Sequence, residues 1–256
     1  MNIPFLTEDI PWLTTAQMVE VDRAMMEDYG IDLVRMMENA GRNLAHLARA
    51  RFLGDDARGK RVVVLAGTGG NGGGALVCAR RLSNYGAAMH VVVTKPDGEF
   101  TPVPGQQLAI LRRMGVPIYQ AKELTQVAQP DLIIDGIIGY SLKGAPRGEA
   151  AALIRWANAA GAPILALDAP SGVDTTTGVV FDPAIRATAT ITLALPKAGL
   201  RAPGVGPHVG ELYLADISVP PELYAEPALG LNVGPIFAKS DIVHLAKPTL
   251  STGIAE

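Results

Sequence analysis

The sequence predicts an α/β fold, a Rossmann-like three-layer α/β/α sandwich with a mostly parallel central sheet and additional N-terminal helices. From residue 60 onward, short runs rich in β-branched residues alternate with helical patterns, which is the rhythm of β-α-β units. Some of these runs, such as residues 164–167, are wholly apolar, as strands are when helices cover both faces of a sheet. A glycine-rich loop follows the first run, where α/β folds place a ligand.

Two helices are expected before the sheet. The first begins near residues 13–17 with Thr14 or Thr15 as its N-cap, since a hydroxyl can accept a hydrogen bond from the free N–H groups of a first turn. The second follows Gly30, and its apolar residues between 33 and 48 recur at intervals of three and four, which defines one apolar face. We expect this face to pack on the chain's own sheet, and contact with a second copy in a homodimer is the alternative.

The remaining elements follow the β-α-β rhythm. Strands are expected at residues 61–66, 89–94, 116–119, 131–135, 163–168, 189–194 and 211–216. Helices are expected near residues 72–86, 104–115 and 148–160. Beyond Pro220 the periodicity weakens and prolines interrupt the chain. We therefore predict a single domain over residues 1–256, with a core of about 13–222 and an irregular C-terminal tail over 223–256.

Composition excludes several classes of partner. The chain has 256 residues, 48% of them hydrophobic, which is enough for a substantial core. Its net charge of −3 and scattered basic residues predict no nucleic-acid partner. No apolar run approaches the ~20 residues of a membrane helix, so no membrane partner is expected. The N-terminus lacks the pattern of a secretory signal, and the single cysteine, Cys78, is expected to be a core residue. These features predict a cytoplasmic protein.

The first unusual loop spans residues 66–75. Its glycines allow a positive φ and let backbone N–H groups approach a phosphate at the start of the following helix. Residues 67–72 match the spacing G-x-G-x-x-G. The next strand, however, ends at Thr94-Lys95-Pro96 and lacks the acidic residue that holds the ribose of NAD in dehydrogenases. Ordinary dehydrogenase chemistry is therefore disfavoured, and a flexible turn without a ligand is the alternative.

Two further strands end on an aspartate. Asp135 ends an apolar strand and precedes more apolar residues rather than a helix start, so contact with a ligand or cation is favoured over helix capping. Asp168 precedes Pro170-Ser171-Gly172, a tight turn that would hold its carboxylate near the Ser171 hydroxyl. A turn that only ends the strand is the alternative there. If the strands are neighbours, all three loops should converge on one pocket.

In order and spacing, these segments resemble the N-terminal domain of the YjeF type, which is found in NAD(P)H-hydrate epimerases. That family carries G-x-G-N-N-G-G-D-G, V-D-A-x-x-G-T-G, D-I-P-S-G-x-D and A-P-K-x-G. The matching segments here are residues 67–75, 134–141, 168–174 and 195–199, preceded by Met-Glu-Asn-Ala-Gly at 37–41. The resemblance covers roughly residues 13–222, and the order of several motifs is far more specific than any single one.

The resemblance implies an isomerase that epimerises the R and S forms of hydrated NADH or NADPH, a nicotinamide nucleotide repair reaction. It also implies a potassium ion held by Asn71, Asp135 and Ser171, which offer the hard oxygen ligands that such a cation prefers. Asp168 is the predicted catalytic acid/base. The implied substrate contacts are Gly70, Asn71, Gly72, Gly73, Gly74, Gly139, Tyr140, Ser141, Leu142, Lys143, Gly144, Ala145 and Asp168. Lys143 and Lys197 are secondary candidates for contacting a phosphate.

The chain departs from the family pattern at two places. Gly70 and Gly74 stand where the family has Asn and Asp, and Tyr140-Ser141 replace Thr-Gly. Such changes remove polar contacts to a ligand, so a non-catalytic nucleotide-binding or dimerisation module of the same fold is the alternative function. Retention of the four residues predicted to hold the cation and perform the chemistry favours the enzyme. A serine hydrolase is disfavoured because Ser171 lacks the flanking pattern G-x-S-x-G.

Overall fold

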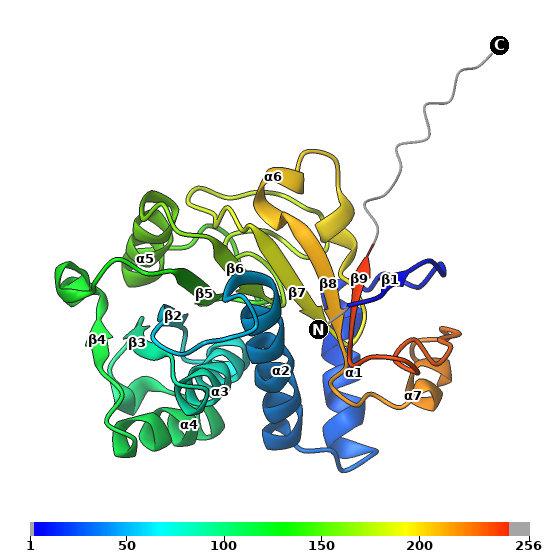
Figure 1. Ribbon diagram of the computed structural model, residues 1–256. Coiled ribbons are helices and arrows are strands. Elements are labelled where there is room, and N and C mark those ends of the chain that lie inside the picture. Colours follow the sequence, from blue (N-terminus) through cyan, green and yellow to red (C-terminus); the bar gives the residue numbers. More distant parts are fainter. Residues whose placement is uncertain (1–2, 246–256) are drawn as a thin grey trace.

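The computed structural model describes residues 3–245 and contains a nine-stranded sheet in the order β1-β9-β8-β7-β6-β5-β2-β3-β4 (Figure 1). Neighbouring strands are parallel except for β8 and β9. The strands are β1 (Phe5–Leu6), β2 (Arg61–Ala66), β3 (Ala88–Val93), β4 (Ile118–Gln120), β5 (Leu132–Gly136), β6 (Ile164–Leu167), β7 (Ala189–Leu193), β8 (Glu211–Ala215) and β9 (Ile242–Leu245). The predicted mostly parallel sheet is confirmed.

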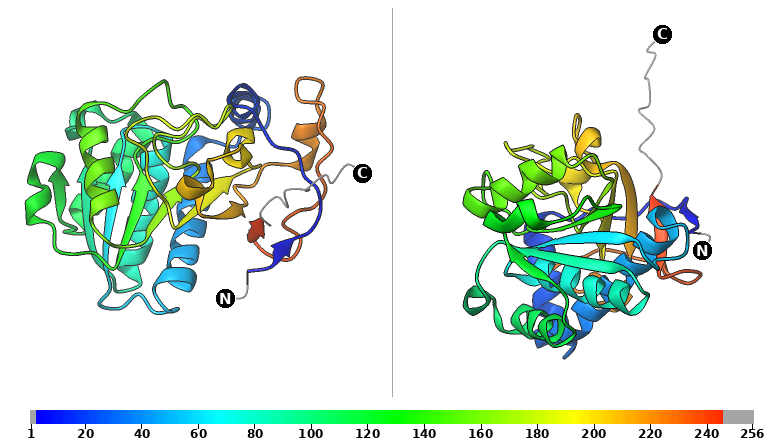
Figure 2. Two further views of the ribbon diagram at one scale, coloured as in Figure 1. Left: turned by 90° about the horizontal axis from the view of Figure 1, so that it is seen from above. Right: turned by 60° about the vertical axis from the view of Figure 1, so that its left-hand side comes forward.

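Helices cover both faces of this sheet, as Figures 1 and 2 show. The helices are α1 (Thr15–Glu27), α2 (Leu33–Leu47), α3 (Gly70–Asn84), α4 (Pro102–Arg113), α5 (Gly148–Ala159), α6 (Gly206–Val209) and α7 (Pro221–Ala225). Short helical turns are η1 (Ala48–Phe52), η2 (Asp97–Glu99), η3 (Ala121–Gln126) and η4 (Ala198–Arg201). In β2, Val62 and Val64 pack in the cluster that includes α3 and α4, whereas Val63 and Leu65 pack in the cluster that includes α5. This alternation produces the predicted three layers.

The two N-terminal helices begin where the sequence predicts. Thr14 caps α1: its hydroxyl accepts from the Gln17 N–H at 3.3 Å, and the Gln17 side chain accepts from the Thr14 N–H at 2.9 Å. This reciprocal pair is a capping box. The apolar face of α2 packs on α3, and a Cβ on Gly41 would collide with Val77. That face is thus covered within the chain, while the homodimer itself stays a prediction.

The prediction of an irregular tail over residues 223–256 is wrong for two segments. Residues 223–225 belong to α7. Residues 242–245 form β9, which pairs antiparallel with β8 and parallel with β1. This four-residue strand has too little pattern of its own to be recognised, and it is held by hydrogen bonds to the sheet edge and by burial of Val243 and Leu245. Residues 246–256 of the predicted tail lie outside the described residues.

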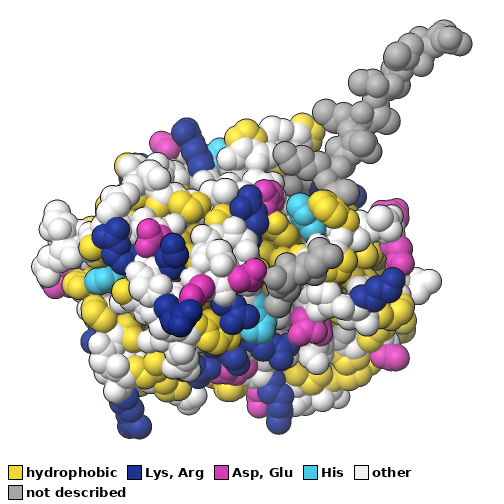
Figure 3. All heavy atoms as spheres, in the orientation of Figure 1, with side chains coloured by type: hydrophobic (Ala, Val, Ile, Leu, Met, Phe, Trp, Pro, Cys, Tyr) yellow, Lys and Arg dark blue, Asp and Glu magenta, His cyan; other side chains and the backbone are white. Residues whose placement is uncertain are grey.

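The surface agrees with the charge pattern of the sequence. On the face drawn in Figure 3, basic and acidic side chains are interspersed, and several form ion pairs, such as Arg51 with Glu211 at 2.8 Å. Cys78 is fully buried in the core, as predicted. Within residues 3–245, none of the helices is both long and apolar enough to cross a lipid bilayer.

Candidate active site

The glycine loop ends at the start of α3, where Gly69 is the N-cap. None of the glycines at 67–74 has a positive φ, so the sequence argument from left-handed backbone is wrong for this loop. Close packing explains some of the glycines instead: a Cβ on Gly72 would collide with the Gly67 carbonyl oxygen, and one on Gly73 would lie 2.6 Å from the Met37 sulfur, whereas Gly69 and Gly70 have room for a Cβ. The glycines therefore bring the first turn of α3 against α2 and leave its N–H groups near the sheet edge.

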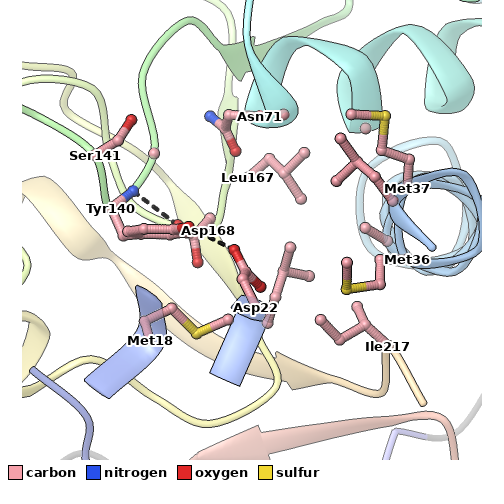
Figure 4. Close-up of a pocket in the computed structure, with 16 residues that line it drawn as sticks. Met18, Asp22, Met36, Met37, Asn71, Tyr140, Ser141, Leu167, Asp168 and Ile217 are labelled. Carbon is pink, nitrogen blue, oxygen red and sulfur yellow. Dashed lines mark hydrogen bonds between the residues drawn. The ribbon is translucent and has the colours of Figure 1, made fainter. Parts of the chain in front are cut away.

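A cavity of about 300 Å³ opens beyond the carboxyl ends of β6 and β7, bounded by α1, α2 and the start of α3 (Figure 4). One part of its wall is apolar and consists of Met18, Leu33, Met36, Met37, Ala40, Leu167, Leu193 and Ile217. The polar side chains that reach it are Asp22, Asn71, Tyr140, Ser141 and Asp168. An apolar cavity with a few convergent polar groups is typical of a small-molecule site.

Asp168 is the most constrained residue of this cavity. Its backbone has φ +66°, a left-handed conformation that is strained for a residue with a side chain. Its carboxylate Oδ1 lies 2.6 Å from the Lys197 ammonium, and Oδ2 accepts a hydrogen bond from the Tyr140 N–H at 2.9 Å. Lys197 is fully buried and also donates to the Leu193 carbonyl at 2.7 Å. The carboxylate is thus held in one orientation by a buried cation and a backbone donor.

Asp135 lies in a different environment, near the end of the buried strand β5. It is fully buried, and its carboxylate accepts from the Ser171 hydroxyl at 2.6 Å and the Ser171 N–H at 2.8 Å. The Ile137 N–H donates to it at 3.2 Å. Burial raises the pKa of Asp135 to about 6, and these hydrogen bonds only partly oppose that rise. The Ser171 hydroxyl, which the sequence argument placed beside the Asp168 carboxylate, is hydrogen-bonded to Asp135 on the neighbouring strand instead.

Asn71, at the start of α3, lies close to the loop that carries Gly139. A Cβ built on Gly139 would lie 2.9 Å from Asp168 Oδ2 and 3.2 Å from Asn71 Oδ1, so both side chains converge on this glycine. The Asn71 Nδ2 atom is buried, and no group within residues 3–245 accepts its hydrogen bonds. A buried amide without a partner is costly and points to a bound group. The loops after β2, β5 and β6 therefore meet at one place.

A second cavity, about 620 Å³, adjoins the first at the carboxyl ends of β2, β3 and β5. The two cavities share Gly70, Asn71, Gly139 and Ser141. The second one extends past Thr94-Lys95 to the start of α5. Together they form an extended trough that a small ring would not fill.

The predicted substrate contacts divide into two groups. Those that line one or both cavities are Gly70, Asn71, Gly74, Gly139, Tyr140, Ser141 and Asp168. Those outside both linings are Gly72, Gly73, Leu142, Lys143, Gly144 and Ala145. Gly72 and Gly73 are buried in the first turn of α3, whereas Lys143 is exposed on the loop that follows Ser141. Contacts of the second group with a substrate stay predictions.

Two functional groups escaped the sequence reasoning. Lys197 was predicted as a secondary contact to a phosphate, but it is buried and ion-paired with Asp168; its position just after the apolar Ala194 and Leu195 was the available signal. Asp22 lies on α1 beside the buried Met18, Val21 and Met25, so a carboxylate next to an apolar helix face was the signal there. Burial raises the pKa of Asp22.

Comparison with known proteins adds an independent line of support. The YjeF-related protein N-terminus family matches residues 34–199. An NAD(P)H-hydrate epimerase of Dehalogenimonas lykanthroporepellens is 43% identical over 236 residues, covering 90% of this chain and 92% of that protein. The bifunctional NAD(P)H-hydrate repair enzyme Nnr of Salinibacter ruber is 36% identical, and the match covers 82% of this chain but 41% of that protein. The crystal structure of yeast ynu0 superimposes with a TM-score of 0.75 at 25% identity, covering 92% of this chain and 100% of that one.

Proposed function

The chain belongs to the YjeF-related protein N-terminus family, and on that premise we propose that it is an isomerase interconverting the R and S epimers of hydrated NADH and NADPH. Relatives of nearly the same length bear the name NAD(P)H-hydrate epimerase. The observation that carries the proposal is the buried Asp168–Lys197 pair, which faces an apolar cavity at the carboxyl ends of the strands. The reaction would be a step in nicotinamide nucleotide repair.

The chemistry requires proton transfer at the hydrated ring. Water added to the enamine of a dihydropyridine leaves a hydroxyl on the carbon next to the ring nitrogen. To invert that carbon, either its C–O bond or its C–N bond must break and form again, and both routes move protons. The Asp168 carboxylate, held by Lys197 and the Tyr140 N–H, is oriented for this work. The methionine and leucine side chains of the wall make the surroundings of this carboxylate apolar.

The glycine loop suits the nucleotide part of such a substrate. α3 has 15 residues and begins at Gly70, so its first N–H groups and its dipole favour a phosphate at this end. The 300 Å³ cavity is too small for a whole dinucleotide, whose remainder would occupy the adjoining cavity past Ser141. The unpartnered Asn71 amide lies where the two cavities meet and would donate to a substrate oxygen.

The residues present fit a potassium ion. Asn71, Asp135 and Ser171 supply oxygen atoms of the hard type, and the fully buried Asp135 has no ion-pair partner within residues 3–245. A bound potassium ion would offset the charge of Asp135 and order the loops after β2, β5 and β6. Cytoplasmic location, the homodimer, and the absence of nucleic-acid and membrane partners stay predictions from the sequence.

A non-catalytic module is the less favoured function. Replacement of the family Asn and Asp by Gly70 and Gly74 leaves the cavity open rather than filled, because both glycines line it. The buried Asp168–Lys197 pair lies beside that cavity. Two apolar side chains in its place would stabilise the fold equally well. A pair that orients one carboxylate into the cavity suits proton transfer better than dimerisation.

The test is to add folded protein and potassium to a prepared mixture enriched in one hydrate epimer and to follow conversion by chromatography or NMR. We expect the epimers to equilibrate many times faster than in buffer. No acceleration over buffer would contradict the proposed function. Asp28→Asn, which removes an exposed carboxylate at the end of α1, is a control variant that should retain full activity.

A further inference from the structure

One tyrosine holds two carboxylates at its two ends. The Tyr140 N–H donates to Asp168 Oδ2 at 2.9 Å, and the Tyr140 hydroxyl donates to Asp22 Oδ2 at 2.5 Å (Figure 4). Both aspartates line the 300 Å³ cavity, although they come from α1 and from the loop after β6. The two carboxylates are therefore linked through one tyrosine, and both reach the same cavity.

The second oxygen of Asp22 is available to a ligand. Within residues 3–245, no donor is hydrogen-bonded to Oδ1, and Figure 4 shows the side chain pointing into the cavity between Met18 and Ile217. The charged and titratable groups around it are Tyr140, Lys197 and Asp168, and Tyr224 on α7. Burial is the largest influence on the pKa of Asp22 and raises it, so its acid form persists to a higher pH than that of an exposed aspartate.

Epimerisation through C–O cleavage needs two proton-transfer groups. The hydroxyl leaves from one face of the ring and water returns to the other, so a single fixed carboxylate cannot reach both oxygens. Active sites commonly assign the two roles by placing similar groups in different environments. Here Asp168 contacts an ammonium, whereas Asp22 contacts a neutral phenol in an apolar setting.

We propose that Asp22 is the second acid/base of the epimerisation and that Tyr140 is the positioning residue that sets its distance from Asp168. This inference rests on the proposed function. In one direction, the Asp22 acid donates its proton to the hydroxyl oxygen. The C–O bond then breaks, its electron pair stays on the oxygen that leaves as water, and the ring-nitrogen lone pair forms an iminium C=N bond. Water then adds to the other face, the C=N electrons return to nitrogen, and the Asp168 carboxylate accepts the proton. In the opposite direction the two aspartates exchange roles. After each turnover Asp168 releases its proton to solvent and Asp22 takes one up, so the enzyme returns to its starting state and protons and water balance.

Asp22→Asn is the direct test, because the amide retains the size of the side chain and can still accept from Tyr140. We expect kcat to fall by about 10²–10⁴-fold, with a much smaller change in KM. Asp22 must carry a proton to act as the acid, so the wild-type rate should fall as the pH rises and Asp22 loses that proton. This alkaline limb of the pH profile should disappear in Asp22→Asn.

Further variants separate chemistry from structure. Tyr140→Phe removes the positioning hydroxyl but keeps the carboxylate, so it should lose less activity than Asp22→Asn and shift the alkaline limb without abolishing it. Asp22→Glu should recover part of the lost activity. Asp28→Asn, on the same helix, should behave as the wild type. Melting temperatures and circular dichroism would identify any variant that fails to fold.

The outcomes distinguish this inference from the proposed function. If the wild type does not epimerise the hydrates, the proposed function fails and Asp22 with it. If the wild type is active and Asp22→Asn keeps its kcat, or loses activity with an unchanged pH profile, only the role of Asp22 is overturned. Incorporation of ¹⁸O from labelled water into the epimerised hydrate is expected, and its absence would exclude C–O cleavage.

Discussion

Two neighbouring parallel strands, β5 and β6, lead to an aspartate each, yet the two carboxylates have opposite surroundings. Asp135 is fully buried among neutral donors of Ser171 and Ile137, with the pKa of its carboxyl raised to about 6 by burial. Asp168 lines a cavity and contacts a buried ammonium at 2.6 Å. The same motif thus places one carboxylate where a cation would bind and the other where a substrate would react.

The difference arises from what the next loops contribute. The Pro170-Ser171-Gly172 turn directs its serine toward Asp135, one strand away, rather than toward Asp168 on its own strand. Lys197, which follows β7, supplies the cation for Asp168. The surroundings of each carboxylate therefore come from the loop that follows the neighbouring strand. The following variants test whether the two aspartates have separate roles.

The largest effect is expected for Asp168→Asn. If Asp168 is the acid/base, epimerisation should fall by about 10³-fold or more, and loss of the counter-charge to buried Lys197 should also lower the melting temperature. Activity is measured with the hydrate mixture and stability by thermal unfolding. An unchanged rate would move the acid/base role to another residue.

Lys197→Met should strongly destabilise the protein although it keeps the Asp168 carboxylate. Leaving one member of a buried ion pair without its partner costs about 3–5 kcal/mol, which urea unfolding would measure. The double variant Asp168→Asn/Lys197→Met should recover much of that stability but none of the activity. A fully stable Lys197→Met would show that Asp168 does not depend on this cation.

Potassium should stabilise the protein through Asp135 and not through Asp168. A ligand present at about 100 times its Kd adds about 2.7 kcal/mol to the free energy of unfolding, so potassium should raise the melting temperature of the wild type more than an equal ionic strength of a bulky organic cation. This difference should vanish in Asp135→Asn and persist in Asp168→Asn. A potassium effect that survives Asp135→Asn would contradict the assigned ligand set.

The smallest effect is expected for Ser171→Ala. The change removes the hydroxyl that donates to Asp135 at 2.6 Å and accepts from the Ile138 N–H at 2.9 Å. Loss of such a buried hydrogen bond costs about 1–3 kcal/mol, measured by urea unfolding, and the potassium effect should weaken as well. Thr177→Ala, which loses an exposed hydrogen bond to Asp174, is the matched control.

The residue pattern was sufficient for most of the fold. Strand runs and helix periodicity predicted the three layers because each element was long enough for burial to impose its own period. The strand β9 was missed, since its four residues form a strand only against the edge of β8. The glycine loop was predicted as part of the site, but the reason given for its glycines was wrong. Some of these glycines avoid collisions with α2 and with the loop after β5, and such contacts cannot be seen in the local sequence.

The sequence by itself determined where the aspartates stand at the ends of strands, where the serine turn lies and in which order the loops follow. These features depend on residues that are adjacent along the chain. Only the tertiary structure decided which groups face each carboxylate. Tyr140 lies 118 positions from Asp22, and Lys197 lies beyond the next strand from Asp168, so their pairing depends on how α1 and β7 pack around the cavity. The charge state of a buried carboxylate follows from such neighbours and from desolvation, and both exist only once the chain is folded.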